Sequence, residues 1–390
     1  MPDAGYMITD PRTFPDVAGA PSAAQTLYAL ADSSLAADSG QRAEIIDRQV
    51  IAALGAALSG DGDALAAVLV GAPSVSVARH LWRSLDAAWC EAVAPQGAGL
   101  AVSVFALPLV IVTGLDGAGS DGSLPGVLTD PAKLAAILTE FGAVGGNQTI
   151  VLADALVAAG ALDIARLPEI VAWCRLPDVL DPAAGLPERV LAPAPLAFHA
   201  GRESVHLRFL VGTAVAKPGA DLLTDSRVGK WGAPFARELS VQLGAGRVPV
   251  LALPRAPARL LPAVAHGRSA QREVSAQIFA SNAIRKFRGS VGEPTAVISA
   301  HWAPDALQGG ELRLSLSSPF DPRAAEGFLC PLYPLDRVGD VVSMLIDLLR
   351  DCRVTDVRVL PGLHADRVAG TGLPLLFKSD TISGHNSVVH

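Results

Sequence analysis

The sequence predicts a mixed fold, α/β to α+β, in which a helical region near the N-terminus precedes duplicated strand–helix–strand units. The chain has 390 residues, of which 50% are apolar and 18% are charged, as is typical of a globular protein with sizeable cores. Near residue 100 the spacing of apolar residues changes from a helical pattern to alternating and continuous runs. At this length we expect two or three domains.

The N-terminal part of the sequence divides into an arm and a helical region. Residues 1–21 contain four prolines and show little periodicity, so we expect an extended arm there. Beyond the arm, apolar residues recur at helical spacing on two stripes: Ile46, Val50, Ala53, Leu54 and Ala57, and then Val77, Leu81, Leu85, Ala88 and Ala92. The segment SGDGD at 59–63 separates the stripes and is typical of a turn. We therefore predict amphipathic helices whose stripes face a core.

Two strand–helix–strand segments follow. The first has strands at 100–113 and 149–152, and its helix begins with Asp130 as N-cap and Pro131 at the first position. The second repeats this order with an alternating strand at 205–209, a helix near 235–243 and a strand at 248–253. The repetition indicates internal duplication of an α/β unit.

A third segment of the same kind is the clearest. Its strands are at 328–333 and 354–360, and we expect Asp336 to cap the helix between them. This helix carries one apolar stripe at i, i+3, i+4 and i+7 spacing: Val338, Val341, Val342, Leu345, Leu348, Leu349 and Cys352.

The C-terminal half also contains antiparallel elements. The sequence predicts a helix at about 269–287, followed by a hairpin with strands at 295–302 and 311–317. We therefore expect this half to be ferredoxin-like, with split βαβ units. Five prolines without periodicity mark the best domain boundary. The predicted organisation is an arm at 1–21, a helical plus α/β domain at 22–175, a proline-rich linker at 176–203 and an α+β domain at 204–390.

Composition argues against several functional classes. Only 5% of the residues are aromatic, which is few for a surface that stacks bases. The cysteines show no spacing typical of zinc ligands, so we expect buried free thiols and neither metal nor cofactor. The first residues lack a secretory pattern, and no apolar run reaches the ~20 residues of a membrane helix. We expect a cytoplasmic protein without a membrane partner.

A GxGxxG pattern, formed by Gly117, Gly119 and Gly122, follows the first predicted strand. In a dinucleotide-binding site the third glycine lies in the helix, whereas here a segment with Pro125 precedes the helix. We interpret the pattern as a surface loop.

His301 and Cys330 form the first candidate catalytic pair. Alternation along the strand at 295–302 places Ser299 and His301 on one face. The nearby strand that carries Cys330 would supply a thiol, and a Cys/His pair is the minimum for nucleophilic catalysis. The alternative is a buried cysteine that only packs.

Polar residues at the ends of strands form the second set of candidates: Asp154, Arg255, His364, Asp366 and Arg367. In open α/β sheets, ligands gather beyond the carboxyl ends of the strands. We name these residues as candidates for a ligand pocket, with His364 and Asp366 also as candidates for catalysis. Alternatively, Asp154 caps a following helix and His364 is an exposed loop residue.

A basic segment at 254–290 stands out in a chain whose net charge is −7. It contains one acidic residue and seven cations: Arg255, Arg259, Arg268, Arg272, Arg285, Lys286 and Arg288. Such a segment is typical of contact with an anionic partner. Because aromatic residues are few there, we expect no specific nucleic-acid binding. We expect these cations to pair with acidic residues within the protein or on an adjoining subunit.

Four segments, ALADSSLAADSGQRAE, GEPTAVISAH, ELRLSLSS and RVTDVRVLPG, resemble an uncharacterised bacterial family, a domain of unknown function. The resemblance covers scattered segments, and it implies no activity.

The sequence favours a cytoplasmic, non-enzymatic protein that self-associates as a scaffold or interaction protein. Catalytic motifs are lacking, and many alanines and glycines permit close packing between copies. The expected partner is a second copy or another acidic protein. Two alternatives stay open: an enzyme or binding protein for a small anionic ligand at the strand ends, and a nucleic-acid-associated protein that uses the basic segment.

Overall fold

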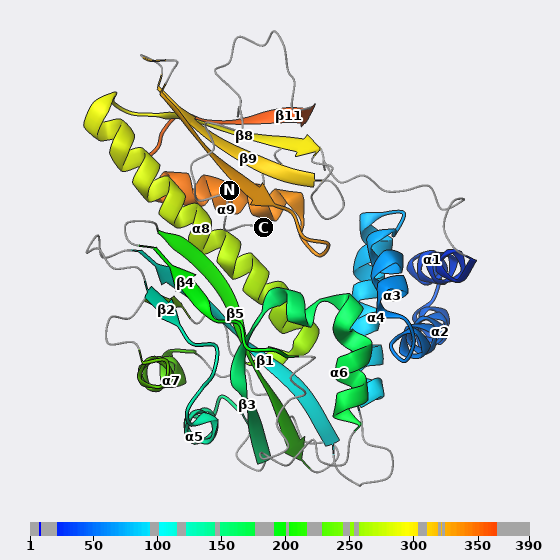
Figure 1. The fold of residues 1–390 in the computed structure, drawn as a ribbon. Coiled ribbons are helices and arrows are strands. Elements are labelled where there is room, and N and C mark those ends of the chain that lie inside the picture. Colours follow the sequence, from blue (N-terminus) through cyan, green and yellow to red (C-terminus); the bar gives the residue numbers. More distant parts are fainter. Residues whose placement is uncertain are drawn as a thin grey trace. The chain divides into compact units, whose positions relative to one another are not determined.

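The computed structural model describes residues 8, 22–93, 101–114, 122–144, 149–175, 191–199, 203–216, 228–244, 250–252, 257–302, 310–318, 321 and 324–364. The fold mixes α-helices and β-sheets, as the sequence predicts (Figure 1). The chain divides into two compact units. The larger unit comprises Ala20–Leu69 and Ser76–Gln271, and the smaller unit comprises Met1–Gly19, Val70–Val75 and Arg272–His390.

Four helices open the described chain: α1 (Ser22–Leu35), α2 (Gly40–Ala57), α3 (Gly62–Val70) and α4 (Val75–Val93). The stripe predicted for α4 is buried throughout, and Val50 and Leu54 form the fully buried part of the α2 stripe. The predicted turn follows α2, and the Asp61 carboxylate accepts the Asp63 N–H at the start of α3. A Cβ on Gly62 would lie 1.9 Å from the Ala165 carbonyl oxygen, so this turn requires glycine.

The main sheet of the larger unit contains β3 (Thr149–Ala158), β5 (Ser204–Ala216), β1 (Ala101–Thr113) and β6 (Val250–Ala252), in that spatial order. The short β7 (Ala258–Arg259) also pairs with β1, and all pairings in this sheet are antiparallel. Consequently β1 and β3 run parallel with β5 between them, and β5 and β6 run parallel with β1 between them. Two further strands, β2 (Gly122–Leu124) and β4 (Leu196–Phe198), form a separate ribbon.

Two helices, α5 (Pro131–Glu140) and α7 (Val228–Gln242), lie together on one face of this sheet (Figure 1). The core between them and the sheet includes Phe105, Trp231 and Phe235. Asp130 caps α5 as predicted, because its carboxylate accepts the Lys133 N–H at 3.0 Å. After β3, the chain forms two 3₁₀ turns, Ala159–Leu162 and Ile164–Arg166, and then α6 (Leu167–Cys174).

A long helix, α8 (Leu260–Ser290), begins well before the position near 269 that the sequence predicts. Its early part packs on β1 and β5 through Gly267, where a Cβ would lie 2.8 Å from the Phe209 ring and 3.0 Å from Pro108. The absence of a side chain therefore lets the helix approach the sheet closely. The boundary between the two units falls within α8, after Gln271.

The smaller unit contains a four-stranded sheet in the order β10 (Ala325–Pro331), β9 (Gly310–Ser317), β8 (Thr295–Trp302) and β11 (Val357–His364). The predicted hairpin is confirmed as the antiparallel pair β8–β9, and β11 runs parallel to β8. The later part of α8 and the helix α9 (Val338–Asp351) pack on one face of this sheet (Figure 1). Of the stripe predicted for α9, five positions are buried: Val338, Val341, Val342, Leu345 and Leu349.

The predicted cap of α9 is wrong. The N-cap residue is Arg337, which makes no side-chain cap bond. The carboxylate of Asp336 instead accepts the Tyr333 N–H at 2.7 Å and the guanidinium of Arg272. A buried arginine offers this carboxylate a charge-assisted bond, which is stronger than a bond to a neutral helix N–H.

Parts of the predicted organisation fall outside the described residues. Within the arm at 1–21, only Ile8 is described, and it packs against the apolar core of the smaller unit. Within the linker at 176–203, residues 191–199 are described, and β4 lies among them. The four-part domain division stays a prediction. Among the helices of the described chain, none is both long enough and apolar enough to cross a membrane.

Candidate functional site

One face of the smaller sheet carries buried polar side chains, which we call the buried polar face: Ser299, His301, Glu311, Arg313 and Ser315. These residues alternate along β8 and β9 with the apolar residues that face α8 and α9. The strand register pairs His301 with Glu311 and Ser299 with Arg313.

Hydrogen bonds connect much of this face. The Ser299 hydroxyl lies 2.8 Å from Nε2 of His301, and Nε of Arg313 donates to the Glu311 carboxylate at 2.6 Å. The ion pair neutralises both charges locally, as buried ionised groups require. The Ser315 hydroxyl is buried without a hydrogen-bond partner. On this polar face the Ser299–His301 contact is a candidate for proton transfer.

His301 and Cys330 do not form the candidate pair, and the alternative of a buried cysteine that packs is confirmed. The backbone register places Cys330 opposite Leu312, which in turn pairs with Ala300. All three residues belong to the apolar core beneath α8 and α9, whereas His301 lies on the other face of the sheet. Burial raises the pKa of the Cys330 thiol to about 12, which disfavours the reactive thiolate and agrees with a packing role in the core.

We predict that Cys330 resists alkylation in the native protein at neutral pH and reacts after unfolding. The thiolate is the reactive form, and burial disfavours it. Iodoacetamide labelling read by peptide mass spectrometry measures the rate at each cysteine. A His301→Ala variant is expected to leave the Cys330 rate unchanged. If His301 activated this thiol, native Cys330 would react readily and the substitution would slow the reaction.

Of the five candidates at the strand ends, the structure describes Asp154 and the backbone of His364. Asp154 is exposed and lies within β3, which continues to Ala158, so it neither ends the strand nor caps a helix. His364 is the last residue of β11, at a strand end as the sequence predicts, and the register pairs its backbone with that of His301. The other three candidates, Arg255, Asp366 and Arg367, lie outside the described residues, as do Gly117 and Gly119 of the glycine pattern, while Gly122 begins β2.

Most cations of the basic segment pair with carboxylates of the same chain. Of the six that are described, five do so: Arg259 with Asp86, Arg268 with Asp163, Arg272 with Asp336, Lys286 with Glu326, and Arg288 with Glu293. The prediction of internal pairing is confirmed for these residues. Because their charges are already compensated, they offer little free positive charge to a phosphate backbone.

Arg272 and Asp336 form the most buried of these pairs. The Arg272 side chain is 6% exposed, and its guanidinium also donates to the Pro331 carbonyl at 2.9 Å. The guanidinium carbon lies 5.2 Å from the centre of the Tyr333 ring. The pair therefore ties α8 to the segment between β10 and α9, which is a structural role.

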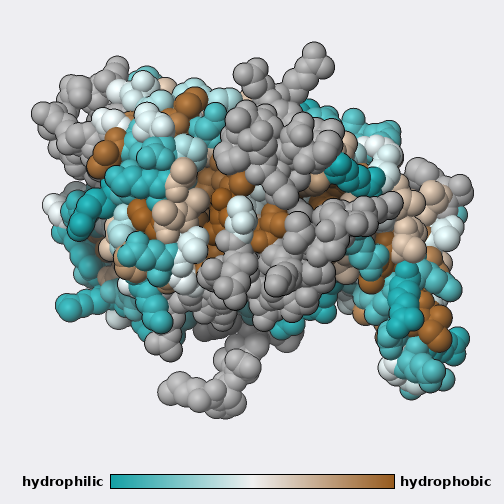
Figure 2. Space-filling model, turned by 90° about the horizontal axis from the view of Figure 1, so that it is seen from below, coloured by the Kyte–Doolittle hydropathy of each residue, from teal (hydrophilic) through white to brown (hydrophobic). Residues whose placement is uncertain are grey.

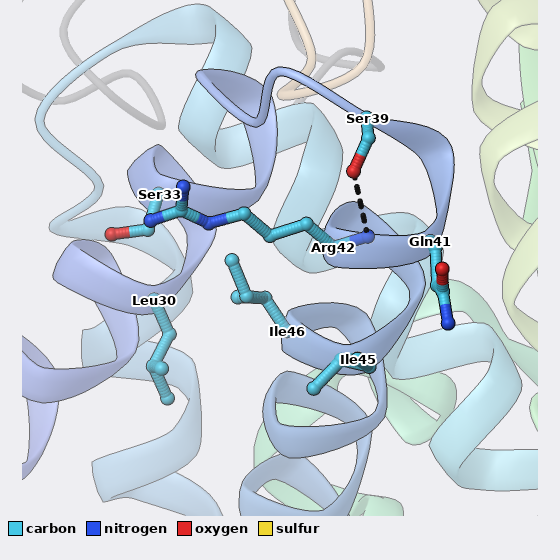
Figure 3. Close-up of a pocket in the computed structure, with 7 residues that line it drawn as sticks. All are labelled: Leu30, Ser33, Ser39, Gln41, Arg42, Ile45 and Ile46. Carbon is cyan, nitrogen blue, oxygen red and sulfur yellow. Dashed lines mark hydrogen bonds between the residues drawn. The ribbon is translucent and has the colours of Figure 1, made fainter.

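A shallow groove between α1 and α2 is a feature that the sequence reasoning missed (Figure 3). Its volume is about 560 Å³, and its lining comprises Leu30, Ser33, Ser39, Gln41, Arg42, Ile45 and Ile46. The apolar lining comes from both helices, and the Arg42 side chain extends toward Ser33 of α1 (Figure 3). The Ser39 hydroxyl accepts the Arg42 N–H and caps α2.

Two large apolar side chains are exposed on this hairpin. Ile45 is 55% exposed and Leu35, the last residue of α1, is 49% exposed. Figure 2 shows apolar surface among hydrophilic surface at the right-hand end of the view, the end at which Figure 1 places α1 and α2. Ile45 lines the groove, whereas Leu35 lies on the side of α1 that faces away from Leu30 and Ser33 of the lining. An exposed apolar side chain that lines a groove is compatible with a contact surface. In the sequence, this surface is indicated by Ile45, an apolar residue that lies next to the predicted stripe of α2 and does not belong to it.

Comparisons with protein-family models, with curated proteins and with solved structures found no match to this chain. The functional interpretation therefore depends on the geometry of the described residues.

Proposed function

We propose that the protein is a non-enzymatic interaction protein that self-associates, and that the α1–α2 hairpin is its contact surface. The observation that carries this proposal is the groove with the exposed side chain of Ile45 in its lining. Fully burying an isoleucine side chain contributes roughly 1.5–3 kcal/mol, so covering the half-exposed Ile45 favours association.

The disposition of the other candidates also supports this proposal. Cys330 is a core residue, and the Glu311–Arg313 pair compensates its own charges. The alternative of a nucleic-acid partner has little support, because five described cations of the basic segment have carboxylate partners. The alternative of a small anionic ligand depends on Arg255 and Asp366, which the described structure does not include.

We also propose a ferredoxin-like fold for the main sheet of the larger unit. The strand order β3-β5-β1-β6, with α5 after β1 and α7 after β5, supports two interlocked βαβ units. These units would be the two copies of a duplication. They occupy residues 101–252, whereas the sequence led us to expect this fold in the C-terminal half.

The proposal of self-association predicts a mass that depends on concentration. Light scattering coupled to size-exclusion chromatography, run on the full chain over a dilution series from about 1 to 100 μM, should show a species of twice the single-chain mass at the upper end. Dissociation constants in the micromolar range correspond to about −8 kcal/mol, within reach of one modest interface. A single-chain mass at every concentration would contradict the proposal.

A further inference from the structure

We infer that the α1–α2 hairpin opens as a local unit, and that the Asp47 carboxylate is the latch that holds it closed. This inference rests on the proposed function, because it states what controls the contact surface. The contacts of Asp47 join α1 to α2 and α2 to α4, so their loss releases the two helices that line the groove.

The packing of α2 is thin compared with that of α4. Val50 and Leu54 are the fully buried residues among the 18 of α2, whereas nine of the 19 residues of α4 are buried. Segments that bury few apolar side chains open locally at a lower free energy than unfolding of the whole domain requires. We therefore expect α2, with α1 beside it, to separate from α4 while α4 stays in the core.

One carboxylate oxygen connects three helices. Oδ1 of Asp47 on α2 accepts the hydroxyl of Ser34 on α1 and lies 3.2 Å from Nε2 of His80 on α4. Ser34 is 7% exposed and the side chain of His80 is 14% exposed. Buried polar groups that lose their partner destabilise the state that buries them. Removing this oxygen therefore favours the open hairpin.

The hinge lies in the turn between α2 and α3. At the start of α3, Gly62 approaches the backbone of Ala165 so closely that no Cβ fits, which fixes the chain from this residue onward. The Tyr28 hydroxyl of α1 donates to the Val68 carbonyl of α3 at 2.7 Å and is a second contact that opening breaks. Movement of the hairpin is therefore confined to the chain before Gly62.

Hydrogen exchange of the full chain, read by mass spectrometry of its peptides, measures this opening. The chain is held at the lowest concentration of the dilution series, and rates are corrected for the intrinsic exchange of each peptide. In the wild type, α1 and α2 should exchange at least about tenfold faster than α4. Asp47→Ala should raise the rates in α1 and α2 by at least about a further tenfold and leave those in α9 unchanged.

Two further variants isolate the role of the oxygen. Asp47→Asn keeps an acceptor at the same place, so its rates should stay within about threefold of the wild type. Asp32→Ala is the matched control, because it removes an exposed carboxylate from the same hairpin and should leave exchange unchanged. Light scattering of Asp47→Ala should show association weakened by at least about tenfold, because the contact surface exists only in the closed hairpin.

The outcomes separate the latch from the proposed function. Wild-type exchange that is equally slow in α2 and α4 overturns local opening. Equal rates in Asp47→Ala and Asp32→Ala, or in Asp47→Asn and Asp47→Ala, overturn the carboxylate oxygen as the latch. Faster exchange in Asp47→Ala with unchanged association overturns the control of the contact surface. A wild-type chain that is monomeric at every concentration contradicts self-association, and the exchange rates still decide whether Asp47 is the latch.

Discussion

Val342→Asp is expected to prevent the smaller unit from folding. Val342 is fully buried at the centre of the α9 stripe, in the core between α9, α8 and the sheet. An unpaired charge in such a core costs several kcal/mol, which is comparable to the whole stability of a domain. Urea unfolding followed by circular dichroism, with limited proteolysis mapped by mass spectrometry, should show cleavage within 272–364 under native conditions.

The neighbouring residue provides the control for this variant. Ser343 is exposed on the same helix, so Ser343→Asp adds the same charge without burying it and should change stability by less than about 0.5 kcal/mol. A Val342→Asp chain that unfolds at the same urea concentration as the Ser343→Asp chain would contradict the assignment of this stripe to the core.

Asp336→Ala should destabilise the smaller unit by about 3–5 kcal/mol. The substitution leaves the Arg272 guanidinium buried without its charge partner, and it also removes the acceptor of the Tyr333 N–H. The exposed pair Arg350–Asp347 on α9 provides the comparison, because its side chains are mostly solvated. Asp347→Ala should therefore cost at most about 1 kcal/mol. Equal losses in the two variants, measured by urea unfolding, would show that the Arg272 pair is solvated.

The sequence predicted those elements whose apolar pattern is continuous. The α9 stripe, the α4 stripe and the β8–β9 hairpin have such patterns, and they form where expected. The sequence pattern did not predict that α8 begins at Leu260, because proline and glycine, here Pro262 and Gly267, usually mark the end of a helix. Tertiary contact explains the exception at Gly267, which lies against Phe209 and Pro108. That contact involves residues far apart in the sequence, so no local pattern contains it.

The mistaken pairing of His301 with Cys330 has a similar cause. Alternation along one strand correctly placed Ser299 and His301 on the same face. Whether Cys330 shares that face depends on two successive strand registers, from β8 to β9 and from β9 to β10. A shift of one residue in either register would exchange the faces, and the register depends on turn geometry that the strand pattern alone does not contain.

The sequence did not predict the proposed contact surface, because the exposure of a side chain depends on how the helices of the hairpin pack together. The buried stripe of α2 was visible as a helical pattern, but Ile45 differs from Ile46 only by its position around the helix axis. Which of the two packs inward depends on where α1 and α4 lie. The bonds of Asp47 to Ser34 and His80 fix that placement, and they join residues from three helices.

An inter-copy distance between labels on α2 tests the central claim most directly. A chain with Ala52→Cys as its labelling site, and with the half-buried Cys90 and Cys352 changed to serine, accepts a spin label on the exposed face of α2. Dipolar spectroscopy at a concentration that favours the dimer should give a single distance below about 30 Å between the labels, because contacting helix axes lie about 8–10 Å apart and the 18 residues of α2 rise about 27 Å. The distance should disappear when Ile45→Asp is added. A dimer whose labels show no short distance would contradict self-association through the α1–α2 hairpin.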